Sequence, residues 1–333
     1  EETVQQQWMT RSRDMLEFGP EKLVIGEGPK GASFDFRDPK VLKIGDMWYM
    51  VLASAMNGQA AILLYKSGDM EHWSYVKPLL TEKEEGIRCF ECPDFFSLDG
   101  CYVAWGALMC HKDRGGRFQM SRYYIGEFKD ENFSVESTGW YDFGSNCYAM
   151  QSFEHEGRRI AIGWISDFYG EHVKAEDSAY GSATIPRVLH VKEHKLYMTP
   201  VEEIYTLKGE KLYTGEKENI CLQQITGNSF YAGISFAGDT DFNLLLGRDG
   251  KKKIRFVKEN GFAGIRTSGV KSETVKFPAD VDVIRNMEIF VDRRVVEIYL
   301  NGGEAAGTKL FYNSNTDGCF ILEAEEPEKI ERA

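Results

Sequence analysis

Three observations on the 333-residue sequence predict an all-β protein in which a β-propeller is followed by a β-sandwich. Helical periodicity is scarce, and most segments are short alternating or apolar runs separated by Gly, Asp and Asn, which is typical of strands and turns. A hairpin-like unit recurs in the first part of the chain. After about residue 205 the chain still has the strand pattern, but the unit no longer recurs.

The recurring unit is a strand, a tight turn that contains glycine, and an aromatic strand. Its three copies are "VLKIGDMWYMVLAS", "FFSLDGCYVAWGAL" and "SFEHEGRRIAIGWIS". Glycine in the turn allows a positive φ, and the flanking β-branched and aromatic residues can pair across the strands. The turns recur at roughly 50–60 residues, a spacing that suits a propeller with elaborated blades.

The C-terminal part differs from the repeating part. Residues 200–208 are expected to form a short helix or a connector. The segments "FYAGISFAG", "FNLLLGRDG" and "MEIFVDRRVVEIYLNGG" then alternate between apolar and polar residues, as in a sandwich whose strands face a core on one side. We therefore predict a propeller domain over residues 1–207 and a β-sandwich domain over residues 208–333.

Charge and composition restrict the partners. The chain carries 52 acidic and 40 basic residues, a net charge of −12. This charge disfavours nucleic acid, whereas a neutral, hydroxyl-rich substrate is indifferent to it. Aromatic residues make up 13% of the chain, which is typical of β-rich proteins and carbohydrate binders. We expect a small carbohydrate substrate and no nucleic acid.

The cysteines and the apolar runs bear on location. Seven cysteines at irregular spacing do not form a disulfide framework, which indicates a reducing compartment and predicts a cytoplasmic protein. No apolar run approaches the length that crosses a membrane, so no membrane association is expected. The first ten residues lack the basic start and apolar centre of a signal peptide.

Two acidic residues stand out as candidates for chemistry. Asp38 lies in "FDFRDPKV" and Glu91 lies in "FECPDFF". Each acid has a proline next or next but one, and the residue before a proline is pushed toward an extended conformation, so each segment is expected to be a strand edge that turns into a loop. Apolar neighbours such as Phe90 favour a protonated Glu91, whereas Arg37 favours an ionised Asp38. One protonated and one ionised carboxyl are the pair that glycoside cleavage uses.

Other interpretations of these residues remain open. Buried acids often pair with backbone amides for structural reasons, without any catalytic role. Cys89 and Cys92 form a CxxC pair, but no second CxxC or histidine follows at zinc spacing, and no βαβ context supports a redox site. We therefore expect no metal and no cofactor, with both thiols structural or lining a pocket.

Weaker candidates lie further along the chain. "YDFGSNCYAMQSF" contains Asp142 and Tyr148, and "IAIGWISDF" contains Trp164. Tyrosine and tryptophan beside a polar pocket can stack on a sugar or donate a hydrogen bond to it. Each of these residues alone is more often part of a core.

Several segments resemble one family in the same order along the chain. "FRDPKV" and "FECPDFF" resemble the RDP and EC motifs of glycoside hydrolase family 32, which includes invertases, sucrose-6-phosphate hydrolases, levanases and inulinases. "YDFGSNCYAMQSF", "RRIAIGWIS" and "SATIPRVL" followed by "LYMTPVEEIYTL" are similar to later segments of that family. "MEIFVDRRVVEIYLNGGEAAGTKLFY" resembles the signature of its sandwich domain. The resemblance covers essentially the whole chain.

The resemblance implies a five-bladed propeller followed by a β-sandwich, and retaining hydrolysis of β-fructofuranosides without a metal. Glu91 matches the general acid/base. Asp38 matches the carboxylate that binds fructose hydroxyls and stabilises the transition state. Arg37 and Cys92 match neighbours of these groups in the pocket. The sugar-contacting aromatics of the family match Tyr148 and Trp164.

One family motif has no counterpart here. The family nucleophile lies in Trp-Met-Asn-Asp-Pro-Asn-Gly, and no Asn-Asp-Pro occurs in these 333 residues. The resemblance implies that the chain begins inside the second blade. An open propeller would leave strand edges bare. We therefore expect one of three situations. The N-terminal segment is missing from this chain and belongs elsewhere, a homo-oligomer covers the open edge, or the protein is a degenerate sugar binder without turnover.

Three functional hypotheses follow. The first is a β-fructofuranosidase that acts on sucrose or sucrose 6-phosphate, present here in an N-terminally incomplete form. The second is a non-catalytic carbohydrate-binding homologue of the same fold, in which Asp38 and Glu91 serve binding alone. The third is a related five-bladed enzyme that cleaves arabinan or xylan, against which the EC motif and the sandwich signature argue.

Overall fold

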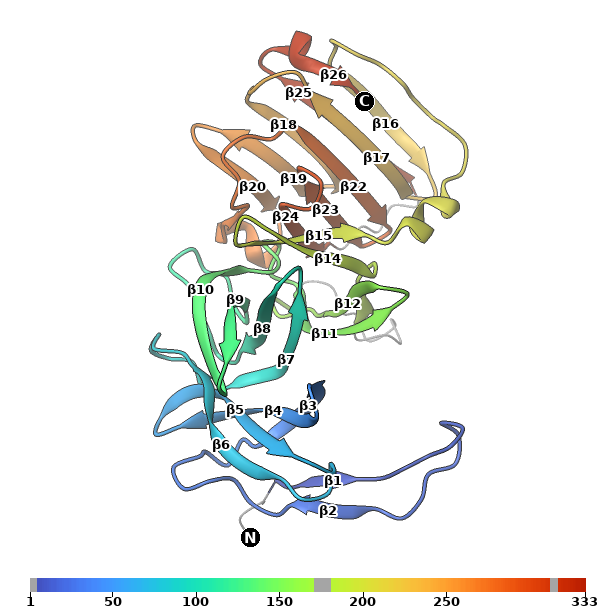
Figure 1. Cartoon of the computed structure of the whole chain (residues 1–333). Coiled ribbons are helices and arrows are strands. Elements are labelled where there is room, and N and C mark those ends of the chain that lie inside the picture. Colours follow the sequence, from blue (N-terminus) through green and yellow to red (C-terminus); the bar gives the residue numbers. More distant parts are fainter. Residues whose placement is uncertain (1–4, 171–180, 312–316) are drawn as a thin grey trace. The chain divides into compact units, whose positions relative to one another are not determined.

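The computed structural model describes residues 5–170, 181–311 and 317–333 (Figure 1). The chain forms two compact units. Unit 1 comprises Glu1–His111 and Gln119–Gly139, and unit 2 comprises Lys112–Phe118 and Trp140–Ala333. Within the described ranges the regular structure is almost entirely β-strand, apart from three short 3₁₀ segments. The predicted all-β class is confirmed.

Unit 1 contains two four-stranded antiparallel sheets whose strands follow one another in chain order. The first sheet is β3 (Arg37–Ile44), β4 (Met47–Met56), β5 (Gln59–Ser67) and β6 (Ser74–Thr81). The second is β7 (Phe90–Leu98), β8 (Cys101–Leu108), β9 (Ser121–Lys129) and β10 (Asn132–Trp140). A two-stranded hairpin, β1 (Gln7–Met9) and β2 (Lys22–Ile25), precedes them. Such four-stranded meanders are the unit of a propeller.

Unit 2 begins with a third sheet of the same kind. Its strands are β11 (Cys147–His155), β12 (Arg158–Ile165), β14 (Arg187–Lys192) and β15 (Lys195–Pro200), and β13 (Ser182–Ala183) pairs with β12. The 3₁₀ segment η1 (Glu202–Leu207) follows, where a short helix or connector was predicted. The repeated hairpin therefore corresponds to the first two strands of three successive sheets.

The rest of unit 2 is a two-sheet sandwich around one apolar core. One sheet has the order β16 (Ile220–Thr226), β25 (Asp317–Ala324), β18 (Phe242–Asp249), β19 (Lys252–Glu259), β20 (Phe262–Ser268) and β21 (Phe277–Pro278). The other has the order β24 (Ala305–Leu310), β23 (Val295–Leu300), β22 (Asn286–Asp292), β17 (Ser229–Phe236) and β26 (Ile330–Arg332). Two more 3₁₀ segments are η2 (Lys271–Thr274) and η3 (Pro327–Lys329).

The hairpin turns lie at the residues where the sequence predicts them. Asp99 and Gly100 join β7 to β8 with φ of 49° and 85°, and Glu156 and Gly157 join β11 to β12 with φ of 50° and 74°. Two successive positive φ angles match the right-handed twist of the flanking strands. Gly45 supplies a positive φ in the corresponding turn between β3 and β4.

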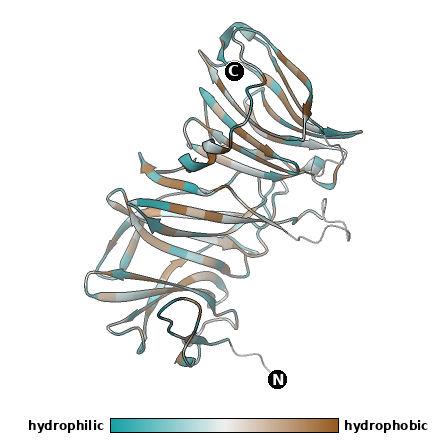
Figure 2. Cartoon of the chain, turned by 90° about the vertical axis from the view of Figure 1, so that its right-hand side faces the viewer, coloured by the Kyte–Doolittle hydropathy of each residue, from teal (hydrophilic) through white to brown (hydrophobic). Residues whose placement is uncertain are grey.

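The central blade strands are covered on both faces. Residues 51–53 of β4 and residues 61–64 of β5 are fully buried, so burial there is continuous and does not alternate. Figure 2 shows hydrophobic residues gathered along the strands. Burial on both faces explains why these strands are long apolar runs in the sequence. No helix within the described ranges is long and apolar enough to cross a bilayer.

Candidate active site

The first strand of each blade sheet carries a bulge at a corresponding place. In β3, Arg37 lies opposite Ala53, and the regular register resumes only at Lys40. In β7, Glu91 lies opposite Ala107, and the register resumes at Asp94. A bulge leaves extra residues unpaired and turns a neighbouring side chain to a new direction, and bulges are frequent beside active sites.

Counting from the bulges makes the candidate residues equivalent. Arg37, Glu91 and Tyr148 each occupy the last paired position before the register shift. The next residue in β3 and β7 is Asp38 or Cys92, with φ of 56° or 46°. Non-glycine residues rarely adopt this conformation, and when they do it is often at functional sites. The family-type motifs thus mark one backbone feature repeated in three sheets.

The expectation that these segments are strand edges turning into loops is wrong in detail. Asp38 and Glu91 lie within β3 and β7, and each strand continues for several residues beyond the bulge. Pro39 and Pro93 fall inside the bulges. Proline lacks an N–H for the ladder and is tolerated in a strand where pairing is already broken. The prolines therefore mark bulges and not strand ends.

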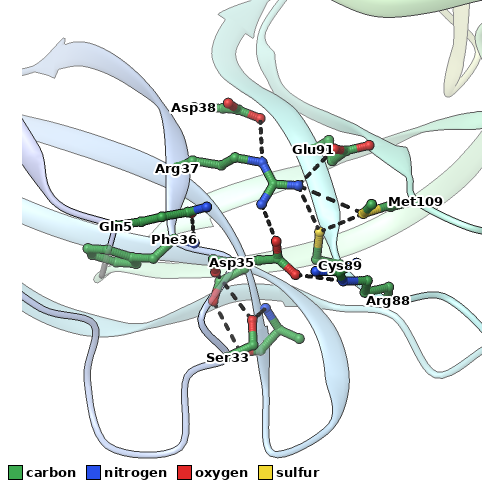
Figure 3. A network of polar contacts seen from close by, with 12 residues as sticks. Gln5, Ser33, Asp35, Phe36, Arg37, Asp38, Arg88, Cys89, Glu91 and Met109 are labelled. Atoms are coloured by element: carbon green, nitrogen blue, oxygen red, sulfur yellow. Dashed lines mark hydrogen bonds and ion pairs between the residues drawn. The ribbon is translucent and has the colours of Figure 1, made fainter. Parts of the chain in front are cut away.

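Arg37 is the centre of the polar network in unit 1 (Figure 3). Its Nη2 donates to Oε1 of Glu91 at 2.8 Å, and its Nη1 donates to the carboxylate of Asp35. Its Nε lies 3.9 Å from Oδ2 of Asp38. Burial alone would lower the pKa of Arg37, but the hydrogen bonds to Glu91 and Asp35 outweigh burial and raise it. Arg37 therefore carries a permanent positive charge between the two candidate acids.

Asp38 joins the two first strands directly. Its Oδ2 accepts a hydrogen bond from the backbone N–H of Cys92 at 2.9 Å, across from β3 to β7. The side chain of Asp38 is 31% exposed and that of Glu91 is 18% exposed, so both remain open to a small molecule. The structure thus brings together four of the six predicted site residues: Arg37, Asp38, Glu91 and Cys92.

Two members of this network were not predicted. Asp35 is only 2% exposed and contacts two guanidinium groups, those of Arg37 and Arg88. The signal in the sequence is the alternation in "FDFRD", which puts Asp35 and Arg37 two residues apart and so on the same side of an extended chain. Arg88 precedes Glu91 by three residues, and nothing local to it indicates a partner 53 residues away.

The two cysteines beside Glu91 have the properties of buried neutral thiols. Burial raises the pKa of Cys89 to about 12, and it raises that of Cys92 to about 12 with a further contribution from Asp38. Metal ligation and redox exchange both use the thiolate. Within the described parts of the chain, no three His, Cys, Asp or Glu side chains form a group that could hold a metal ion.

We expect Cys89 and Cys92 to react slowly with iodoacetamide in the folded protein at pH 8, because a thiol with a pKa near 12 is almost entirely neutral there. Cys110 and Cys221 are exposed and serve as internal controls. The reaction is quenched at a series of times, and mass spectrometry of the proteolytic peptides measures the order in which the cysteines are alkylated. Alkylation of Cys92 as fast as that of Cys221 would contradict the neutral, buried thiol.

The two predicted aromatic contacts lie in unit 2. Tyr148 and Trp164 are cross-strand partners on β11 and β12. Both meet the ring of Phe168 edge-on, with centroids 5.0 Å and 6.0 Å away. Tyr148 is buried, whereas Trp164 is 45% exposed. Trp164 is therefore the more accessible of the two to a ligand, and the role of both residues stays a prediction.

Comparison with known proteins adds independent information. A sequence model described as the glycosyl hydrolases family 32 N-terminal domain matches residues 1–200, and one described as the family 32 C-terminal domain matches residues 208–330. A sucrose-6-phosphate hydrolase of Zymomonas mobilis is 28% identical over 90% of this chain and 64% of its own length. One from Staphylococcus xylosus is 27% identical over 89% of this chain and 64% of its own length. The chain thus spans less than two thirds of these relatives.

Solved structures agree with the sequence relatives. A glycoside hydrolase family 32 structure from Bifidobacterium adolescentis is 29% identical and superposes with a TM-score of 0.90, covering 97% of this chain and 61% of that one. A β-fructofuranosidase from Bombyx mori shares the fold with 24% identity and a TM-score of 0.83, covering 99% of this chain and 72% of that one. These likenesses confirm the predicted class of propeller blades followed by a sandwich.

Proposed function

Because the chain belongs to glycoside hydrolase family 32, we propose that the protein is a retaining hydrolase of β-fructofuranosides such as sucrose or sucrose 6-phosphate. One observation carries the proposal. Equivalent bulges on β3 and β7 set Asp38 and Glu91 on either side of the Arg37 guanidinium. The named activities of the relatives from Zymomonas mobilis and Staphylococcus xylosus support the choice of substrate.

Glu91 acts as the general acid and then as the general base. Its protonated carboxyl gives a proton to the glycosidic oxygen as the bond between that oxygen and the fructose anomeric carbon breaks. The anomeric carbon forms an ester with a nucleophilic carboxylate, which we do not assign to a residue of this chain. The carboxylate of Glu91 then takes a proton from water, whose oxygen attacks the anomeric carbon and releases the nucleophile.

Asp38 holds the sugar and stabilises charge. Its Oδ2 is fixed by the Cys92 amide, so the carboxylate has a defined orientation before substrate arrives. An ionised carboxylate near the ring favours the positive charge that develops in an oxocarbenium-like transition state. Arg37 and Cys92 form the wall beside these two acids, and Tyr148 and Trp164 are proposed to contact the sugar.

The domain boundary and location are also part of the proposal. We place the change from propeller to sandwich between residues 207 and 208, directly after η1. All seven cysteines are free, which supports the cytoplasm as the location. The candidate acids then belong to the propeller domain.

The proposal is tested by measuring binding and turnover together. Sucrose, sucrose 6-phosphate and an arabinan oligosaccharide are each titrated into the protein by calorimetry, and released monosaccharides are quantified in parallel. Release of fructose from sucrose or its phosphate is the expected result for the whole protein, whereas residues 1–333 alone contain no Asn-Asp-Pro motif and are expected to release fructose negligibly. Binding without release would favour a carbohydrate-binding protein, and release of arabinose alone would refute a β-fructofuranosidase.

A further inference from the structure

Asp35 is a buried carboxylate that holds two guanidinium groups at once. Its Oδ1 accepts from Nη1 of Arg37, and its Oδ2 accepts from Nε of Arg88 at 2.9 Å. A buried carboxylate is costly to desolvate unless it is paired, and here both oxygens are paired with a cation. The position of Asp35 is thus set by two charge-assisted contacts (Figure 3).

The backbone around Asp35 is held as firmly as its side chain. The N–H of Phe36 donates to Oε1 of Gln5 at 2.7 Å, and the carbonyl of Phe36 accepts from Nε2 of Gln7 at 2.8 Å. The hydroxyl of Ser33 donates to the carbonyl of Asp35 at 3.2 Å. The segment that leads into β3 therefore cannot rotate Asp35 away from Arg37 without breaking several hydrogen bonds.

The contact with Asp35 decides how Arg37 meets Glu91. A guanidinium is planar and presents its donors in a fixed fork. With Nη1 turned to Asp35, only Nη2 faces Glu91, so the contact with Glu91 is a single hydrogen bond and not a two-point one. The sulfur atoms of Cys89 and Met109 lie 3.7 Å and 3.8 Å from the same Nη2 and limit other orientations.

We propose that Asp35 is a positioning residue for the acid/base Glu91, because it orients Arg37 and offsets part of its charge. This inference rests on the proposed function of Glu91. Asp35 does not touch the substrate in this scheme and acts only through Arg37.

The chemical reason is the proton that Glu91 must carry. A cation beside a carboxyl group favours its ionised form, which cannot act as an acid. Asp35 supplies a negative charge on the far side of Arg37 and weakens that effect. Without the negative charge of Asp35, the guanidinium would favour the ionised form of Glu91 more strongly.

Other charged groups of unit 1 adjoin this pair, and none of them is replaced in the test. Among the described residues of unit 1, Asp38, Arg88, Cys89 and Cys92 are titratable or charged side chains beside Asp35, Arg37 or Glu91. The two cysteines stay neutral near pH 7. D35N therefore removes one negative charge from beside the guanidinium groups of Arg37 and Arg88, while the carboxylates of Asp38 and Glu91 remain.

The test compares pH profiles of kcat for the whole wild-type protein and its D35N and D94N variants, with sucrose as the substrate. For D35N we expect kcat at pH 7 to fall about tenfold and the upper limb of the profile to move about one unit toward lower pH. D94N is the matched control, because Asp94 is also fully buried, also paired with a cation, and on the strand of Glu91. D94N should keep the wild-type limb even where it lowers stability.

D35E separates charge from placement. It keeps the negative charge but moves the carboxylate by one methylene, so we expect the wild-type limb with an intermediate kcat. A wild-type kcat for D35E, or an unmoved limb for D35N, would overturn the inference. An active wild type with an inactive E91Q would still uphold the proposed function in that case, whereas a wild type that releases no fructose would refute the proposed function itself.

Discussion

Replacing Glu91 with glutamine is expected to lower the turnover of sucrose by roughly 10²–10⁴-fold, the contribution of general acid–base catalysis. The amide has the shape of the carboxyl, and its oxygen can still accept from Nη2 of Arg37. It can neither give a proton to the leaving oxygen nor take one from water. Calorimetry should therefore find the affinity for sucrose within about threefold of wild type, since that change is worth less than 1 kcal/mol.

The control for this prediction is E82Q. Glu82 also accepts hydrogen bonds from an arginine, Arg122 at 2.6 Å, and from the hydroxyl of Tyr124 at 2.7 Å, and it lies in the same unit. We expect E82Q to keep most of the turnover. Wild-type kcat for E91Q would remove Glu91 from the acid/base role, and equal losses in E82Q and E91Q would indicate a structural effect.

Removing Arg187 is expected to destabilise unit 2 by about 3–5 kcal/mol, the usual cost of breaking a buried ion pair from one side. Arg187 is fully buried at the start of β14, and its Nη2 lies 3.0 Å from Asp142 and 3.1 Å from Glu297. Those two acids lie before β11 and on β23, so the arginine joins the third blade sheet to the sandwich. R187M would leave two buried carboxyls without their cation. Urea denaturation monitored by fluorescence measures the loss.

The loss of folding free energy in R187M should also depend on pH. Burial raises the pKa of Asp142 and of Glu297, while Arg187 lowers both, so in R187M both values rise further above those of the unfolded chain. An acid with a higher pKa in the folded state favours folding at low pH, and that advantage is lost as pH rises through the folded pKa. The deficit of R187M should thus be smaller at pH 5 than at pH 8.

R158M is the control for R187M. Arg158 pairs with Glu203 at 2.8 Å, but Glu203 is exposed, so this pair is a surface ion pair with little net effect. We expect no measurable change in its urea midpoint at either pH. A midpoint of R187M as close to wild type as that of R158M would contradict a structural role for the buried cluster.

The local features of the fold could be predicted from the sequence. The glycine-containing turns predicted the first hairpin of each blade, because glycine is the residue that most easily adopts the positive φ seen at Gly100 and Gly157. The motifs around Asp38 and Glu91 likewise singled out two residues that the fold brings to either side of one guanidinium.

Long-range pairings were not accessible in the same way. Asp142 was a weak candidate for the site, yet it is a buried partner of Arg187, 45 residues away. Glu297 is 110 residues from Arg187, and Asp35 finds Arg88 across 53 residues. Such contacts depend on which strands lie next to one another in the fold. The hydrophobic periodicity of a single sequence predicts the strands but not their neighbours. The bulges were missed because proline near an acid also fits a strand end.

The stereochemistry of fructosyl transfer tests the central claim most directly. With sucrose as donor and methanol as acceptor, NMR of the first-formed methyl fructofuranoside identifies its anomeric configuration. A retaining enzyme with Glu91 as acid/base predicts the β-anomer from wild type and its loss in E91Q. The α-anomer from wild type, or an undiminished yield of the β-anomer from E91Q, would contradict the account.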